Sequence, residues 1–185
     1  IHIQHLTSGR AAHLLREAGR RGTPASCELT PHHLALCDAD IPGDDARYKM
    51  NPPLRAPEDR DALRDALADG TIDCFATDHA PHPADRKALG FREAPFGVIG
   101  LETAVGVTWT GAVRTGAIEA LHWLRLWTTA SADIAVLDLD SPWTVDPDRL
   151  VSRSRNTCFS GWTLFGRCVY TFHSGRKVWD AAASA

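Results

Sequence analysis

The alternation of apolar strand-like segments with amphipathic helix-like segments over residues 1–77 constrains the fold of this chain more than any other feature. Residues 1–6 and 25–29 read as short strands. Between them, Ser8 can cap a helix over residues 9–21, in which alanine and leucine recur at helical spacing. This part of the chain is therefore predicted to form a strand, a helix and a second strand.

The alternation continues after a long polar loop. The loop spans residues 30–55 and contains several prolines, so we predict that it has no regular structure. Pro57 stands at the helix position that proline favours, and this helix is predicted to end at Gly70, before a third strand over residues 71–77. Elements in this order predict an α/β fold of parallel βα units, whose functional groups gather at the carboxyl ends of the strands.

The chain changes character after two further predicted helices. These span residues 97–111 and 117–128, and Leu121, Leu124 and Trp127 are expected to form the buried stripe of the second helix. Short β-like segments separated by Gly, Pro, Ser and Asp follow, and they predict a small separate β domain. The predicted division is residues 1–130 for the βα part, 131–180 for the β domain and 181–185 for a C-terminal tail.

Composition argues against several classes of function. The 185 residues carry a formal net charge of -3 and no run of Lys and Arg, so we expect no nucleic-acid partner. No apolar stretch reaches the roughly 18 residues that a membrane-spanning helix needs, and no signal pattern opens the chain, so we expect no membrane association. The five cysteines are odd in number and lack Cys-x-x-Cys spacing, which favours reduced thiols in the cytoplasm.

The segment Thr77-Asp78-His79-Ala80-Pro81-His82 places one carboxylate and two imidazoles directly after a predicted apolar strand. Such a group can bind a divalent metal, and the carboxylate can accept a proton from metal-activated water. An Asp cap beside two surface histidines is the alternative from this segment alone. His5 also ends a predicted strand, and strand ends meet at one mouth in a parallel barrel, so His5 and Asp78 can share an ion.

Four more motifs accompany this segment along the chain. They are His5-Leu6-Thr7-Ser8, Glu28-Leu29-Thr30-Pro31-His32-His33-Leu34, Asn51-Pro52-Pro53-Leu54-Arg55 and Glu93-Ala94-Pro95-Phe96-Gly97. In content and order, the five motifs resemble class I dihydroorotases of the amidohydrolase superfamily, and the resemblance covers nearly the whole chain. The combination of the Asn51 and Asp78 motifs separates it from hydantoinase-like and allantoinase-like relatives.

The resemblance implies the C-terminal part of a zinc-dependent cyclic amide hydrolase. Its fold would be part of a (β/α)8 TIM-like barrel, strands six to eight with their helices, plus a small C-terminal β-sandwich domain. His5 is implied as a zinc ligand, and Asp78 as both a zinc ligand and the catalytic acid and base. The implied substrate-binding residues are Asn51, His82, Phe96 and Gly97, the last two through their backbone.

The implied reaction is the reversible closure of N-carbamoyl-L-aspartate to dihydroorotate with loss of water, a step of pyrimidine biosynthesis. The resemblance also suggests two zinc ions in the complete protein, and a homodimer or a complex with a carbamoyltransferase. Two alternatives stay open. One is an inactive dihydroorotase-like subunit that acts as a scaffold for a carbamoyltransferase, and the other is a cyclic amidase of the hydantoinase or allantoinase type.

The sequence departs from the family in two places. It lacks a His-x-His pair and the other ligands of strands one to five, and it opens inside a predicted strand. We therefore expect the real polypeptide to be longer and these residues alone to be inactive. A further helix and strand of the family are missing near Thr129-Ala130-Ser131. Either a segment is absent from the sequence as given or the polypeptide is truncated, and we favour the first because unpaired strand edges promote aggregation.

Three further polar residues near the strand ends are left without a site role. His32 and His33 follow a strand, but the family pattern places neither among the metal ligands, and adjacent side chains of an extended chain face opposite ways. We favour structural or supporting roles for them. Glu28 can orient a ligand histidine or be a carboxylate paired within the core, and the sequence leaves both readings open.

Overall fold

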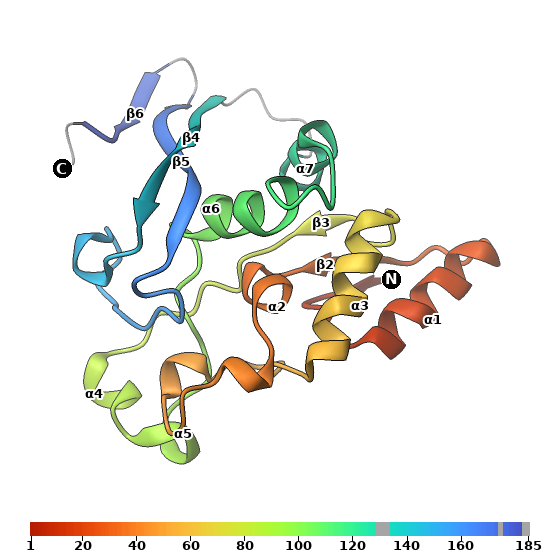
Figure 1. Cartoon of the computed structure of the whole chain (residues 1–185), viewed down its shortest axis with the longest axis horizontal. Coiled ribbons are helices and arrows are strands. Elements are labelled where there is room, and N and C mark those ends of the chain that lie inside the picture. The colour runs from red at the N-terminus through yellow and green to blue at the C-terminus, as the bar shows by residue number, and fades with distance from the viewer. Residues whose placement is uncertain (129–133, 174–175, 183–185) are drawn as a thin grey trace.

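The computed structural model describes residues 1–128, 134–173 and 176–182. Within these residues the chain forms two three-stranded sheets, one parallel and one antiparallel. Figure 1 shows that the two sheets lie apart, that helices cover the parallel sheet, and that further helices lie between the sheets. The prediction of parallel βα units in the first part of the chain is confirmed.

The parallel sheet consists of three short neighbouring strands. They are β1 (His2–Ile3), β2 (Ser26–Leu29) and β3 (Cys74–Phe75), in the order β1-β2-β3. Cys27 and Leu29 are fully buried on the face that packs against helices, so the alternation along β2 turns Glu28 to the opposite face. All three strands are shorter than predicted, because the chain leaves the sheet soon after each of them.

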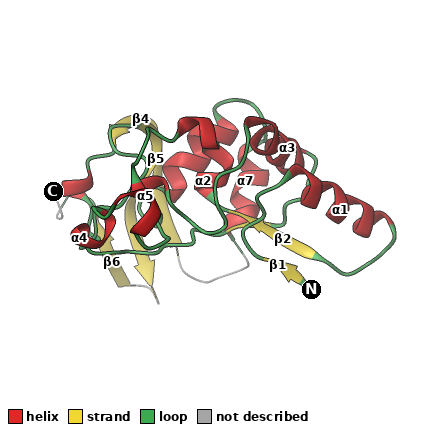
Figure 2. Cartoon of the chain, turned by 90° about the horizontal axis from the view of Figure 1, so that it is seen from below, coloured by secondary structure: helices red, strands yellow, loops and turns green. Residues whose placement is uncertain are grey.

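Two helices cover the apolar face of this sheet, and both begin where their sequence predicts. In α1 (Gly9–Arg20) the Ser8 side chain caps the helix by accepting a hydrogen bond from the Ala11 N–H, and in α3 (Pro57–Ala68) Pro57 occupies the first turn. Figure 2 shows α1 and α3 side by side. The core beneath them includes Leu6, Ala12, Cys27, Leu29, Leu63, Ala66, Leu67, Ile72 and Phe75.

The loop after β2 is more regular than predicted. Pro31 does not exclude a helix here, because it lies in the first turn of α2 (Pro31–Ala35), where its missing N–H costs nothing. Thr30 caps this helix by accepting from the His33 N–H. Two short 3-10 turns follow, Asp38–Asp40 and Ala46–Tyr48. The prediction of an irregular loop was wrong because it counted prolines without their position.

The helix predicted over 97–111 begins later than expected. After α4 (Ala84–Lys87) and α5 (Gly90–Glu93), Val98 pairs with His79 in a parallel bridge. The α-helix starts only at α6 (Ala104–Thr108), which continues directly into a π-helical turn. The backbone of residues 97–100 is therefore tied to the strand-end loop that contains Asp78.

Helix α7 (Ala120–Trp127) buries a different face from the one predicted. Leu121 and Leu124 are exposed, while Trp123 and Leu126 are buried. The indole N–H of Trp123 donates to Thr108 Oγ1 at 3.0 Å, which fixes the orientation of the helix against α6. The predicted stripe was therefore wrong for Leu121 and Leu124, because a leucine pattern alone could not show this polar anchor. It was right for Trp127, which packs against the core and contacts the Phe75 ring.

The antiparallel sheet contains the C-terminal strands β4 (Ile134–Thr144), β5 (Thr163–His173) and β6 (Arg176–Asp180). The short β-like segments predicted for this part of the chain are partly joined, since Leu164 and Tyr170 both lie in one long strand, β5. A sandwich needs a second antiparallel sheet, and the described residues contain only this one. The predicted domain boundary at 130/131, the Thr129-Ala130-Ser131 discontinuity and residues 183–185 of the predicted tail lie outside the described residues.

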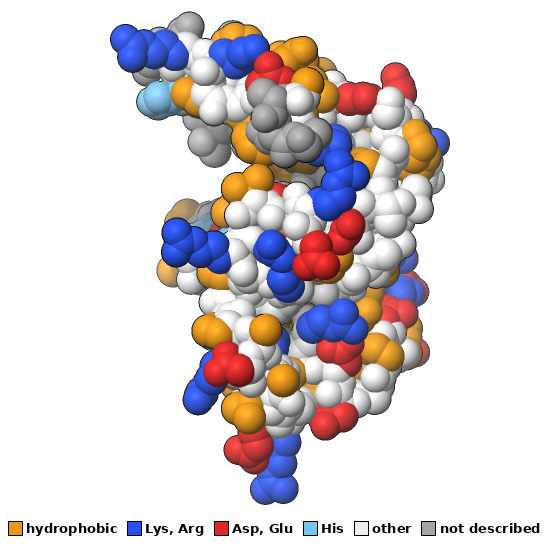
Figure 3. All heavy atoms as spheres, turned by 90° about the vertical axis from the view of Figure 1, so that its left-hand side faces the viewer, with side chains coloured by type: hydrophobic (Ala, Val, Ile, Leu, Met, Phe, Trp, Pro, Cys, Tyr) orange, Lys and Arg blue, Asp and Glu red, His pale blue; other side chains and the backbone are white. Residues whose placement is uncertain are grey.

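The surface mixes charges of both signs. Figure 3 shows Lys and Arg side chains interspersed with Asp and Glu on one face, with scattered apolar side chains between them. Across residues 1–128, 134–173 and 176–182, no helix combines the length and apolar character that crossing a membrane requires.

We predict that Trp123→Ala lowers the free energy of unfolding by about 3–5 kcal/mol, because it empties a buried site and removes the hydrogen bond to Thr108. Leu121→Ala, on the exposed face of the same helix, should change it by less than about 0.5 kcal/mol. Urea unfolding followed by tryptophan fluorescence measures both. Equal losses from the two substitutions would contradict the observed orientation of α7.

Candidate functional site

The ends of β1 and β3 bring His5 and Asp78 together. His5 Nε2 lies 3.6 Å from Asp78 Oδ1, although 73 positions separate the two residues in the chain. Both residues have a positive φ, 51° for His5 and 47° for Asp78, and among the described residues they are the only non-glycine residues that do. This left-handed conformation is strained for a side chain with Cβ and is concentrated at functional sites.

Glu28 of β2 lies between these strand ends on the polar face of the sheet. Its Oε1 is 2.8 Å from His5 Nδ1, and its Oε2 is 3.0 Å from His2 Nε2. The other ring nitrogen of His2 lies 2.8 Å from Ser26 Oγ. A continuous polar chain therefore runs from Ser26 through His2, Glu28 and His5 to Asp78.

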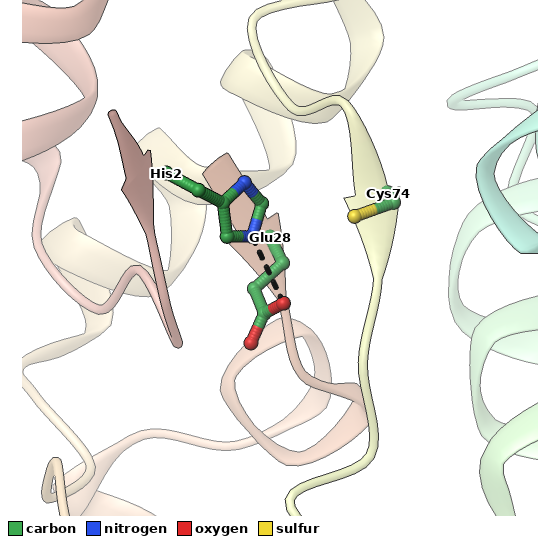
Figure 4. A group of neighbouring side chains, drawn as sticks. All are labelled: His2, Glu28 and Cys74. Carbon is green, nitrogen blue, oxygen red and sulfur yellow. Dashed lines mark hydrogen bonds and ion pairs between the residues drawn. The ribbon is translucent and has the colours of Figure 1, made fainter. Parts of the chain in front are cut away.

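Cys74 joins this group from β3. Figure 4 shows His2 and Glu28 pointing toward each other and the Cys74 sulfur pointing toward them. The potential ligand atoms of these three residues lie within 4.8 Å of one another. Both Glu28 oxygens already face imidazole nitrogens, so we interpret the group as a hydrogen-bond network with a neighbouring thiol rather than a second metal centre.

The electrostatics of Asp78 suit proton transfer. Burial raises the pKa of the Asp78 carboxyl, the positive charge of His5 lowers it, and the negative charge of Glu28 raises it further, with a net upward shift. A carboxyl group with a raised pKa returns a proton more readily near neutral pH than an ordinary Asp does.

The pair His5 and Asp78 fits a shared divalent ion. Ligand atoms about 2.0–2.2 Å from a tetrahedral zinc ion stand about 3.4 Å apart. The observed separation of 3.6 Å between His5 Nε2 and Asp78 Oδ1 matches that geometry. An imidazole nitrogen and a carboxylate oxygen are also ligands that zinc accepts.

His32 and His33 lie in α2 beside this group and differ in their partners. Both are buried, and burial lowers the pKa of each imidazole, that of His33 to about 4. His33 is held at both ring nitrogens, by Thr30 Oγ1 at 2.7 Å and Pro52 O at 3.0 Å. These contacts tie α2 to the loop that carries Asn51, in line with a structural role for His33.

The remaining predicted site residues lie on loops above the strand ends. His82 Nε2 donates to Phe96 O at 2.7 Å, so these two residues are in contact. Gly97 has φ +132°, and a Cβ there would come within 3.0 Å of His82 Nε2 and of the Ala80 carbonyl oxygen. Glycine is therefore required at this position. Asn51 is exposed in the loop before α3.

Two buried lysines fasten these loops, and the sequence motifs did not indicate them. Lys87 Nζ donates to the carbonyl oxygens of Gly97 at 2.9 Å, Pro95 at 3.1 Å and Lys49 at 3.4 Å. Lys49 Nζ donates to Arg92 O and Ala94 O, and Lys49 O accepts from the Gly97 N–H. Hydrogen bonds from Lys49 and Lys87 thus join the Asn51 loop to the Phe96–Gly97 loop.

A second tie comes from far along the chain. Asn156 Nδ2 donates to Gly97 O at 3.0 Å and to Ala80 O at 3.1 Å. Ser154 Oγ donates to His82 O at 2.6 Å. Neither residue stands in a recognisable motif, and only the folded structure shows that they hold the His82 loop.

The chain resembles known dihydroorotases in sequence. No family model matches the chain. The dihydroorotase of Bacillus caldolyticus is 47% identical over 97% of this chain, and that of Anaeromyxobacter dehalogenans is 46% identical over 96%. The chain belongs to the dihydroorotase family. It corresponds to the C-terminal part of these relatives and spans about half their length, 46% and 45% respectively.

Solved structures show the same fold. The L-hydantoinase (dihydropyrimidinase) from Arthrobacter aurescens superposes with a TM-score of 0.85 at 26% identity, covering 97% of this chain and 44% of its own. The dihydroorotase from Saccharomyces cerevisiae, solved with 5-fluoroorotic acid, gives a TM-score of 0.75 at 21% identity, covering 91% of this chain and 50% of its own. These are barrel proteins of the amidohydrolase superfamily, so the parallel sheet corresponds to part of such a barrel.

The alignment with the Bacillus caldolyticus relative extends over 195 residues, more than the 185 of this chain. That relative therefore contains residues that have no counterpart here.

We predict that Lys87→Met lowers the free energy of unfolding by about 1–3 kcal/mol, since it removes the lysine donor from three loop carbonyls. Methionine keeps most of the aliphatic volume, so the loss reports the hydrogen bonds. Lys177→Met is the matched control, because Lys177 is an exposed lysine on β6 whose ammonium group contacts only the Asp180 carboxylate and the Tyr170 ring among the described residues and donates to no loop carbonyl that the structure shows. Urea unfolding of both variants decides the point, and an unchanged Lys87→Met midpoint would show that the lysine does not fasten the loops.

Proposed function

We propose that the protein containing this chain is a dihydroorotase, which interconverts N-carbamoyl-L-aspartate with dihydroorotate and water. The observation that supports this most is the convergence of His5 and Asp78 at 3.6 Å within a chain 47% identical to a dihydroorotase. The order of the Asn51, Asp78 and Phe96–Gly97 motifs agrees with this substrate. In the cell, the reaction would belong to cytoplasmic pyrimidine biosynthesis.

His5 and Asp78 are the proposed metal ligands of this chain. A zinc ion bound there would supply an activated water molecule and polarise the ring amide carbonyl. Asp78 would accept a proton from the attacking water molecule and deliver it to the ring nitrogen as the amide bond breaks, and it would reverse these transfers in ring closure.

The loops above the strand ends are proposed to hold the substrate. His82 and Asn51 offer polar side chains to the anionic substrate, and Phe96 and Gly97 offer backbone groups. Because His82 Nε2 donates to Phe96 O, these groups are already positioned relative to one another. The buried lysines hold that arrangement before substrate binds, which reduces the entropy lost on binding.

Several features of the complete protein belong to the same proposal. From the resemblance to the family we propose that the complete protein binds two zinc ions. We also propose that β1 to β3 are strands six to eight of the barrel, and that the C-terminal strands belong to a β-sandwich. The predicted domains, residues 1–130 and 131–180, stand as part of it. So does assembly as a homodimer or with a carbamoyltransferase. These 185 residues alone offer two ligands and are expected to be inactive.

A hydantoinase is the second candidate, because the Arthrobacter aurescens L-hydantoinase shares the fold at 26% identity. The complete polypeptide should contain zinc and turn over dihydroorotate much faster than hydantoin or allantoin. Metal analysis and absorbance assays with the three ring substrates, side by side, test this. Preference for hydantoin would establish the second candidate, and a metal-free protein without turnover would favour a scaffold subunit.

Replacing Asp78 and replacing His82 should have different effects on kcat, KM and zinc content. Asp78→Ala removes a proposed ligand and the proton-transfer group together, so kcat should fall by at least about 10²–10⁴-fold. His82→Ala should raise KM more than it lowers kcat and leave the zinc content unchanged, because His82 binds the ground state and the transition state alike. Steady-state kinetics with metal analysis compares them. If His82→Ala lost its zinc while Asp78→Ala kept it, the proposed roles of Asp78 as metal ligand and His82 as substrate-binding residue would be wrong.

A further inference from the structure

We propose that Glu28 is the positioning residue of the metal site, which holds the His5 ring with Nδ1–H toward Glu28 and the Nε2 lone pair toward Asp78. His2 and Ser26 hold the Glu28 carboxylate in turn. This inference rests on the proposed role of His5 as a metal ligand. Glu28, His2 and Ser26 are not among the site residues predicted from the sequence.

Glu28 contacts His5 through its side chain and the next residue, Leu6, through its backbone. The Glu28 side chain places Oε1 at 2.8 Å from His5 Nδ1, and the Glu28 backbone carbonyl accepts from the Leu6 N–H at 2.9 Å. The His5 backbone is in the left-handed region at φ 51°, so pairing within the sheet does not orient its side chain. The ring orientation of His5 therefore depends on the Glu28 carboxylate.

The contact with Glu28 determines which ring nitrogen of His5 carries the proton. His5 Nδ1 is buried, and the described residues form no hydrogen bond of regular geometry with it. Glu28 Oε1, at 2.8 Å, is the acceptor that lies within reach of this nitrogen. A carboxylate beside one ring nitrogen keeps the proton there and leaves the other nitrogen free as a ligand. In His5 that other nitrogen is Nε2, which faces Asp78.

The second oxygen of Glu28 is fixed as well. Glu28 is 8% exposed, and a carboxylate that is buried to this extent needs a partner for each oxygen. His2 Nε2 faces Oε2 at 3.0 Å, and the Ser26 hydroxyl at 2.8 Å from His2 Nδ1 fixes the His2 ring. Rotation of the carboxylate would therefore break the hydrogen bond of Oε2 with His2 and remove Oε1 from its 2.8 Å contact with His5 Nδ1.

Glu28→Gln tests this role with little change of shape. An amide has one oxygen, so His2 or His5 must face its NH2 group, while the backbone bond to Leu6 remains. When the NH2 group faces His5, Nδ1 becomes the acceptor and the proton moves to Nε2. We expect zinc affinity of the complete polypeptide, measured by chelator competition, to fall by about 10–100-fold.

A spectroscopic measurement reports the tautomer without metal or turnover. Nitrogen-15 NMR of histidine-labelled, metal-free protein distinguishes the two ring tautomers, and the spectrum of a His5→Asn variant assigns the signal. Wild-type His5 should have its proton on Nδ1, and Glu28→Gln should shift the population toward Nε2–H. Glu102→Gln is the control, since Glu102 accepts backbone N–H groups of Val151 and Ser152 in another region.

The outcomes separate this inference from the proposed function. Unchanged zinc affinity and tautomer in Glu28→Gln would overturn the positioning role, as would a wild-type His5 with its proton on Nε2. If Glu28→Gln does not fold, the wild-type tautomer and a His2→Phe variant, expected to weaken zinc binding less, decide instead. A protein that shows both effects but turns over no dihydroorotate would retain the positioning role and lose the proposed substrate.

Discussion

The parallel pairing of three very short strands is the constraint on which the rest of the structure depends. Glu28 is paired with Cys74 across the sheet, and His2 with Ser26. This register sets the ends of β1 and β3 at one edge, so that His5 and Asp78 meet. Strands of two to four residues supply few backbone hydrogen bonds, and the apolar core under α1 and α3 must therefore hold them in register.

Much of this arrangement could be predicted because it follows local rules. Ser8 and Pro57 mark the helix starts, and the alternation of elements gives parallel strands whose ends converge. The errors arose where local rules need a tertiary partner. Trp123 rather than Leu121 is buried because Thr108, in another helix, accepts from its indole. Pro31 begins a helix because Thr30 caps it, a combination visible in the sequence but overlooked among the other prolines.

The sequence proposed which residues form the candidate site, but it could not predict the contacts between them. The strand ends indicated His5 and Asp78, and the motifs indicated Asn51 and His82. Nothing in the sequence decided whether Glu28 orients a ligand histidine or is a carboxylate paired within the core. Its contact with His5 depends on the strand register and on the positive φ of His5. Lys87 was missed for a similar reason, since its three carbonyl partners lie on two separate loops.

The two halves of the site are held by different physical means, and this affects how each responds to change. His5, Glu28 and Asp78 stand on strand ends above an apolar core, so their spacing is lost only if the sheet is disturbed. The loops of His82 and Phe96 are held by hydrogen bonds from Lys87 and other buried polar groups. Burial and the nearby Lys49 lower the pKa of Lys87 to about 8. Because these hydrogen bonds hold the loops directly, a substitution of Lys87 or another loop anchor should shift His82 and Phe96 while the strand ends keep the His5–Asp78 separation.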